Sequence, residues 1–259
     1  MTKNNEMKGL TGLSNLGNTC FLNSCMQILS NTEELTKILN RKKNLLENVK
    51  ESDKHFKDKL LTKEWMELHE LMWSKNCIIS PGRFLKIVQT VADYKEKDLF
   101  TGFAQNDLPE FLLFIMDTFH NSIHTNVTVN INGTVQNSKD SLAKKCYEVK
   151  KEFYEKEYSL LLETFYGITV STINDLNGKL LSCKPEPFMS LDLAIPNKKL
   201  GGSLTLIDCF KNHCKSELIE KENAWYNEKT KKKQDIKKGL VFWNLPDILI
   251  ITLKRFDDI

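Results

Sequence analysis

Apolar residues recur at helical spacing through most of the first 120 residues of the chain. The pattern begins at Phe21, and Thr32 followed by Glu33 and Glu34 marks the start of a second helix that runs to Leu39. Three further stretches carry the same period, at 61–73, 80–94 and 106–120. We therefore expect a mainly helical N-terminal half.

Two prolines predict where helices begin. Ser80 before Pro81 predicts an N-cap followed by proline at the first helical position. Pro109 is compatible with the helix over 106–120 only if it lies in the first turn.

The pattern changes from helical to strand-like after Asn126. Alternating Val and Ile around Asn132 and Gly133 predict a β-hairpin within 126–137, and 141–165 returns to helix. Strand-like segments follow at 167–173, 178–183, 186–195 and 245–256. Helices first and strands second predict an α+β fold.

Composition and charge assign no partner. The 259 residues are 41% hydrophobic, enough to build a globular core, and 37 Lys and Arg against 34 Asp and Glu leave a net charge of only +3. The lysine-rich stretches 41–59 and 229–238 lack interleaved aromatic residues on which bases could stack. We therefore expect no nucleic-acid partner, and we interpret 228–238 as an exposed loop.

Seven cysteines lie at positions 20, 25, 77, 146, 183, 209 and 214. An odd number without regular spacing is typical of a reducing compartment and does not suggest a disulfide framework. The N-terminus lacks the apolar region of a signal peptide, and no stretch approaches the roughly 20 apolar residues that cross a bilayer. We expect an intracellular protein of the cytoplasm or nucleus, without a membrane partner.

Cys20 lies in GLSNLGNTCFLNSCMQIL, residues 12–29, where a turn-forming segment becomes an apolar helix. Unpaired N–H groups at a helix N-terminus favour the thiolate, the form of cysteine that reacts. Asn15, upstream of it, offers a neutral side-chain donor for a developing oxyanion. This arrangement suits acyl transfer, although a single cysteine is also a common small hydrophobe in protein cores.

The same stretch closely resembles the cysteine box of the ubiquitin-specific proteases, papain-like deubiquitinases whose cysteine attacks the carbonyl after the C-terminal glycine of ubiquitin. Other segments are similar to family boxes in the same order: FAQNDLPEFLLFIMD, LLLETFYG, FMSLDLAIP and LPDILIITLKRF. The resemblance implies the family's right-hand fold in one incomplete catalytic domain, 1–259. Its parts would be a helical thumb over 9–120, a connecting insertion over 121–163, and β-rich fingers with the start of the palm over 164–259.

The resemblance makes Cys20 the nucleophile and Asn15 the oxyanion-hole donor. It places the family's acids that bind the C-terminal tail of ubiquitin at Asp107 and Glu110, which share one helix face. Two carboxylates so placed suit the arginines of ubiquitin's basic tail, because guanidinium groups bond carboxylates bidentately. From the residues alone, Asp107 and Glu110 can also be interpreted as a solvent-facing acidic pair in the first turn of a helix.

The chain departs from the family at a metal site. Fingers in this family often hold zinc through two C-x-x-C pairs, and this sequence contains no C-x-x-C. Cys209, His213 and Cys214 fall close together but lack the second half of a ligand set. We therefore expect no metal and no cofactor.

A second departure concerns the catalytic base. In the family a histidine box, with an Asp or Asn that orients the histidine, follows the segment LKRF, whereas this sequence stops at Ile259. None of its five histidines, at 55, 69, 120, 124 and 213, lies in a segment that resembles the box. Without a base, a thiol is mostly protonated at neutral pH and the leaving amine has no proton donor.

Three explanations stay open: a fragment of a longer protein, a split enzyme whose second chain supplies the rest of the palm, or a degenerate pseudo-enzyme. The intact cysteine box favours the first two. The expected function is hydrolysis of the peptide or isopeptide bond after the C-terminal glycine of ubiquitin, through an acyl-enzyme on Cys20 and a histidine supplied downstream or in trans. The alternative is an inactive scaffold that binds ubiquitin.

Overall fold

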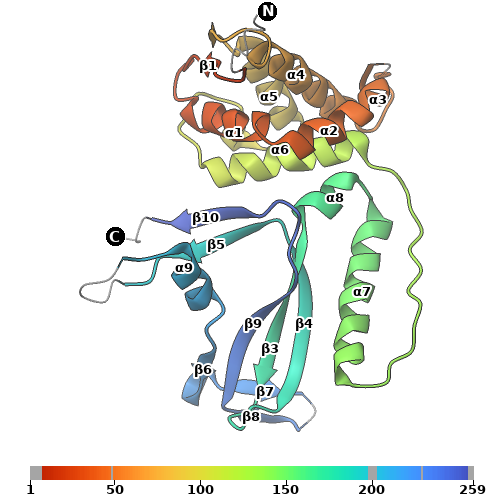
Figure 1. Ribbon diagram of the computed structural model, residues 1–259, viewed down its shortest axis with the longest axis vertical. Helices are drawn as coiled ribbons and strands as arrows, with labels where there is room; N and C mark the ends of the chain where they lie inside the picture. The colour runs from red at the N-terminus through yellow and green to blue at the C-terminus, as the bar shows by residue number, and fades with distance from the viewer. Residues whose placement is uncertain (1–7, 48, 198–202, 229, 256–259) are drawn as a thin grey trace, which may run out of the picture. The chain divides into compact units, whose positions relative to one another are not determined.

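The computed structural model describes residues 8–47, 49–197, 203–228 and 230–255 (Figure 1). The chain divides into two compact units, 1–125 and 126–259. No helix in the described part of the chain combines the length and apolar character needed to cross a bilayer.

The first unit is a bundle of helices around an aromatic core. Its elements are β1 (Gly12–Leu13), α1 (Cys20–Ser30), α2 (Glu33–Arg41), α3 (Lys43–Glu47), α4 (Phe56–Met72), β2 (Ile78–Ile79), α5 (Gly82–Tyr94), η1 (Asp98–Phe100) and α6 (Leu108–Ile123). Helix α4 packs against α5 and α6, and α6 also packs against α1. The large buried side chains include Leu22, Met26, Trp65, Phe84, Phe111 and Phe119.

The predicted helices of this unit are confirmed, although some of their starts differ. Helix α4 begins at Phe56, five residues before the predicted stretch 61–73. Thr32 is the N-cap residue of α2, as the sequence predicts. Ser80, however, is not the N-cap of α5, because that position is occupied by Pro81 and the helix begins at Gly82. Parallel pairing of β1 with β2 continues as a 2.8 Å hydrogen bond from the Ser14 amide to the Ile79 carbonyl. The extended segment therefore reaches Ile79, and α5 begins one residue later than predicted.

The second unit combines a sheet with helices. Its elements are α7 (Ser138–Lys156), α8 (Leu160–Phe165), β3 (Gly167–Asn174), β4 (Leu180–Phe188), β5 (Ser190–Ala194), α9 (Leu206–His213), β6 (Glu217–Ile219), η2 (Lys221–Asn223), β7 (Trp225–Asn227), β8 (Lys232–Gln234), β9 (Ile236–Asn244) and β10 (Ile250–Lys254). The main sheet is antiparallel in the order β4-β3-β9-β6, and β5 pairs in parallel with β10. Helix α7 lies beside β4 (Figure 1).

Two predictions for this unit are wrong in part. The helix predicted over 141–165 is two helices, because the backbone is extended at Glu157 and at Ser159. The segment 228–238 is not simply a loop: it contains β8, which pairs with β7, and the first residues of β9. Exposed lysines hide this strand pattern in the sequence, although Ile236 is buried.

The hairpin predicted within 126–137 is also wrong. The segment contains no strand, and Ile131 and Val135 are exposed. A two-stranded hairpin that has no apolar surface to pack on is marginal in water. The end of the segment instead forms a capping box, in which Asn137 and Asp140 bond each other's backbone amides at the start of α7.

Candidate active site

Asn15 organises the turn that leads to Cys20. Its side-chain oxygen Oδ1 accepts hydrogen bonds from the amides of Gly17 and Thr19, both at 3.1 Å, and from the Thr19 hydroxyl at 3.2 Å. The Thr19 hydroxyl oxygen in turn accepts from the Leu16 amide at 2.9 Å. Because Oδ1 is engaged, the Nδ2 amide group is the part of the exposed Asn15 side chain left to donate to a ligand.

The turn uses two left-handed backbone positions. Gly17 has φ 106° and Asn18 has φ 53°, conformations that glycine and asparagine adopt more readily than other residues. The side-chain amide of Asn18 also donates to the carbonyl oxygen of Phe103 at 3.0 Å. The turn is therefore attached to the segment that precedes α6.

Cys20 is the first residue of α1, and its thiol is exposed. Thr19 occupies the N-cap position without a side-chain bond into the helix, so the first-turn N–H groups receive no side-chain cap. Oriented N–H groups of this kind stabilise negative charge beside them. The sequence thus correctly predicts a turn and a helix start at this position, and the exposure of Cys20 argues against its interpretation as core filler.

Helix α1 is fixed to the strand before it by two polar side chains. Asn23 Nδ2 donates to the carbonyls of Leu13 and Ser14 at 3.2 and 3.1 Å. Gln27 Nε2 donates to the carbonyl of Thr11 at 2.8 Å. Gln27 is therefore a scaffold residue that ties α1 to the segment before it.

Asp107 and Glu110 lie at the start of α6. Asp107 is the N-cap residue, Glu110 is in the first turn, and Pro109 also lies there, as predicted. Both carboxylates are exposed, and the Asp107 side chain makes no capping bond. In the described part of the chain neither carboxylate forms an ion pair, so both are available to an external cation.

Packing joins the two helix starts. The ring of Phe21 lies 5.1 Å from that of Phe111, edge to face, and 6.4 Å from that of Phe100. The structure therefore attaches both the turn and the first residues of α1 to the region around the acidic pair. Neither the Asn18 to Phe103 bond nor this aromatic contact is predicted by the sequence.

The histidines have other neighbours, and no side chain of the described residues hydrogen-bonds the Cys20 thiol. His55 Nδ1 lies 3.5 Å from the Asp58 carboxylate, and His124 Nδ1 lies 2.9 Å from the Asn121 carbonyl oxygen. The centroid of the His120 ring is 6.3 Å from that of His124. The His213 ring stacks on that of Phe242 at 6.5 Å. The described residues bring no histidine into hydrogen-bonding contact with the predicted nucleophile.

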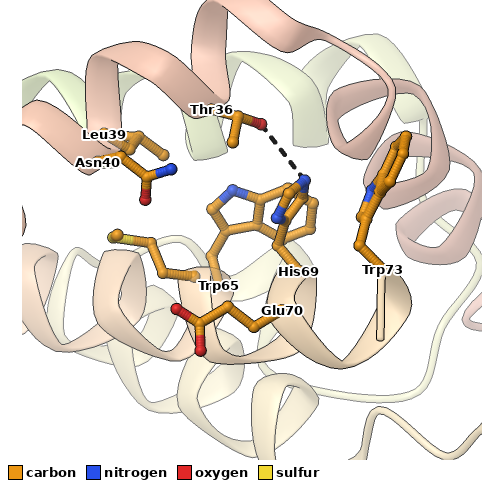
Figure 2. Close-up of a pocket in the computed structure, with 8 residues that line it drawn as sticks. Thr36, Leu39, Asn40, Trp65, His69, Glu70 and Trp73 are labelled. Carbon is orange, nitrogen blue, oxygen red and sulfur yellow. Dashed lines mark hydrogen bonds between the residues drawn. The ribbon is translucent and has the colours of Figure 1, made fainter. Parts of the chain in front are cut away.

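His69 lines a pocket of about 300 Å³ between α2 and α4 (Figure 2). Its Nε2 lies 3.2 Å from the Ser30 carbonyl oxygen and 3.3 Å from the Thr36 hydroxyl, and burial lowers its pKa. Trp65 and Trp73 flank its ring at 5.7 and 5.9 Å. None of the predicted site residues lines this pocket, so it is distinct from the candidate active site.

The cysteines and histidine near α9 do not form a ligand set. Cys209 is buried in an apolar cluster with Leu191 and Leu193. The His213 ring stacks on Phe242, and Cys214 caps the C-terminus of the helix. Apolar packing therefore accounts for the burial of Cys209.

Comparisons with known proteins address the chain as a whole. The family model described as ubiquitin carboxyl-terminal hydrolase matches residues 11–258. Human ubiquitin carboxyl-terminal hydrolase 2 is 30% identical over 256 residues, which cover 97% of this chain and 40% of that protein. Ubiquitin carboxyl-terminal hydrolase 4 of Saccharomyces cerevisiae is 27% identical, with coverages of 99% and 28%. The chain thus spans less than half the length of these relatives.

A solved structure shares the fold. It is the SAGA Ubp8/Sgf11/Sus1/Sgf73 DUB module bound to ubiquitin aldehyde, with a TM-score of 0.66, 23% identity, and coverage of 100% of this chain and 50% of the matched chain. The mixed helix and sheet of this chain agree with the papain-like fold expected from the sequence. With the family model matched over nearly the whole sequence, the chain belongs to the ubiquitin carboxyl-terminal hydrolase family, as a catalytic domain of the ubiquitin-specific protease type.

Proposed function

We propose that this chain carries the nucleophile of a thiol-dependent deubiquitinase, which hydrolyses the peptide or isopeptide bond after the C-terminal glycine of ubiquitin. The observation that carries the proposal is the placement of an exposed Cys20 at the first residue of α1, after a turn in which Oδ1 of Asn15 accepts hydrogen bonds from two backbone amides.

The chemistry follows from these two side chains. The Cys20 thiolate attacks the carbonyl carbon, and Nδ2 of Asn15 donates to the oxygen that becomes negatively charged. The carbon–nitrogen bond then breaks, and the leaving amine takes a proton from a protonated histidine. Water attacks the resulting thioester while the same histidine accepts its proton, which releases the ubiquitin carboxylate and restores the thiol.

The described residues bring no histidine into contact with Cys20, so the proposal takes the catalytic base from elsewhere. We place it in a segment downstream of this sequence or in a second chain that supplies the rest of the palm. The thumb would comprise 9–120, the connecting insertion 121–163, and the fingers with the start of the palm 164–259. No metal is needed for any of these steps.

Asp107 and Glu110 would bind ubiquitin's basic tail. Two exposed carboxylates on one helix start, neither paired within the described residues, suit guanidinium groups that donate two parallel hydrogen bonds. The Phe21 to Phe111 contact supports this role because it places the acids on a helix that packs against α1.

One observation favours a second candidate function. No histidine among the described residues contacts Cys20, which is also the arrangement of an inactive scaffold that binds ubiquitin. Such a scaffold would keep its affinity for ubiquitin after Cys20→Ala and would show no turnover from any length of the protein.

The two candidates are separated by ubiquitin that carries a C-terminal electrophile. We expect a covalent adduct at Cys20, from this chain or from the full polypeptide encoded by the same gene, and no adduct with Cys20→Ser. Cys77→Ser is the matched control, since Cys77 is also an exposed free thiol of the first unit. Absence of the adduct with both lengths, together with retained ubiquitin binding, would refute the enzyme and establish the scaffold.

A further inference from the structure

Two free cysteines of the second unit share one small apolar cluster. Cys146 lies on α7, and Cys183 lies on β4. Cys146 is buried with Ile168 and Val170, and Cys183 packs against this cluster. Cys183 faces Thr172 across the β3–β4 pair, so its side chain is on the same sheet face as Val170, two residues along.

The two thiols differ in access. Cys146 is 0% exposed, whereas Cys183 is half-buried and reachable from solvent. The exposed ammonium group of Lys145 donates to the Cys183 sulfur at 3.6 Å. A cation at this distance would also donate to an oxygen added to that sulfur.

We propose that Cys183 is a peroxide-reactive thiol, and that Cys146 resolves its sulfenic acid to a disulfide that ties α7 to β4. The pair fits the usual arrangement of redox-sensing cysteines, in which an accessible thiol lies next to a resolving one. This inference goes beyond ubiquitin hydrolysis and does not depend on Cys20.

The reaction balances with hydrogen peroxide as the oxidant. The Cys183 sulfur attacks one peroxide oxygen, the oxygen–oxygen bond breaks, and Cys183 becomes a sulfenic acid while one water leaves. The Cys146 sulfur then attacks the oxidised sulfur, the sulfur–oxygen bond breaks, and hydroxide leaves with the Cys146 proton as a second water. In total, two thiols and one peroxide give one disulfide and two waters.

The second step depends on pH. Burial raises the pKa of the Cys146 thiol. The Cys146 thiolate is therefore scarce at neutral pH, and its fraction grows about tenfold for each pH unit below its pKa. Closure of the disulfide is expected to accelerate accordingly between pH 6 and pH 8.

The test is peroxide treatment of the intact chain, followed by alkylation in denaturant, trypsin digestion without reductant, and mass spectrometry. We expect residues 146–150 to be linked to residues 180–198, with the pair recovered as separate peptides after reduction. Cys146→Ala should leave a sulfenic acid on Cys183 that a dimedone probe traps, and Cys183→Ala should abolish the link. Cys214→Ser is the matched control, because Cys214 is a half-buried thiol of the same unit, and this variant should form the link normally.

Three outcomes would overturn the proposal. One is alkylation of both thiols after peroxide treatment, as expected if the two cysteines only fill the core. Another is a link from Cys183 to Lys145 through an oxygen atom, in place of the disulfide. The third is an intermolecular link, recognised by its dependence on protein concentration.

Discussion

Phe21 and Phe111 meet edge to face, with ring centroids 5.1 Å apart and ring planes at 87°. Phe21 follows Cys20 at the start of α1, and Phe111 follows Glu110 at the start of α6. Phe111 is 0% exposed, so this contact belongs to the core of the first unit. Core packing therefore connects the helix of the proposed nucleophile to the helix of the proposed acids.

The substitution Asn15→Asp separates two roles of Asn15, which are to accept hydrogen bonds from the turn and to donate one to an oxyanion. A carboxylate can accept the three hydrogen bonds that Oδ1 accepts, but it cannot donate to an oxyanion. We expect kcat on a fluorogenic ubiquitin substrate to fall by roughly 10²–10³, measured with whichever length of the protein shows turnover, while Tm changes little. Asn15→Ala should lower Tm as well. A near-normal kcat for Asn15→Asp would show that Asn15 only shapes the turn.

Removing the charge of the acidic pair should weaken ubiquitin binding. Asp107→Asn and Glu110→Gln are each expected to cost about 1 kcal/mol, or roughly fivefold in affinity, with a smaller loss at high salt. Stability should be nearly unchanged, because the Asp107 side chain does not cap α6.

The control for this pair is Asp98→Asn, which removes another exposed acid from a helix start of the same unit. Calorimetric titration with ubiquitin measures all three variants. Equal affinities for the Asp107, Glu110 and Asp98 variants would contradict a specific role for the pair.

Gly17→Ala should disturb the turn before Cys20. Gly17 has φ 106°, and forcing a residue with a Cβ into a left-handed conformation costs roughly 1–2 kcal/mol. We expect a lower Tm and slower formation of the ubiquitin adduct at Cys20. Gly102→Ala is the matched control, since no atom lies within 4 Å of a Cβ added there. Similar adduct rates for the two variants would rule out strain in the turn.

His69 should make stability depend on pH. Burial lowers the pKa of His69 below the usual histidine value of 6.5, so the unfolded chain binds the proton more readily than the folded chain. Stability is then full above pH 6.5 and falls as the pH drops from there towards the folded-state pKa. Chemical denaturation of the wild type and His69→Gln at pH 7.5, 6.5 and 5.5 tests this, and the wild type should lose more stability than the variant. Parallel losses would exclude His69 as the cause.

Local pattern predicts most of the first unit. Apolar spacing from Phe21 onwards predicts the pair of helices α1 and α2, and Thr32 predicts the start of the second. The same approach fails for the hairpin within 126–137, because alternation describes a strand only where a partner surface exists. It also predicts no strand between 196 and 244, a range that contains β6, β7, β8 and β9. Exposed lysines in β8 and at the start of β9 conceal strands that pair with β7 and β3.

The sequence by itself determined that Cys20 follows a tight turn and begins an apolar helix, because glycine, asparagine and helical periodicity act through neighbouring residues. It also determined the family, through motifs that are contiguous in the chain. Only the tertiary structure decided that Asn18 bonds Phe103, 85 residues away, that Phe21 packs on Phe111, and that Cys146 meets Cys183. These contacts depend on how whole helices and strands bury their apolar faces against one another, which no local pattern specifies.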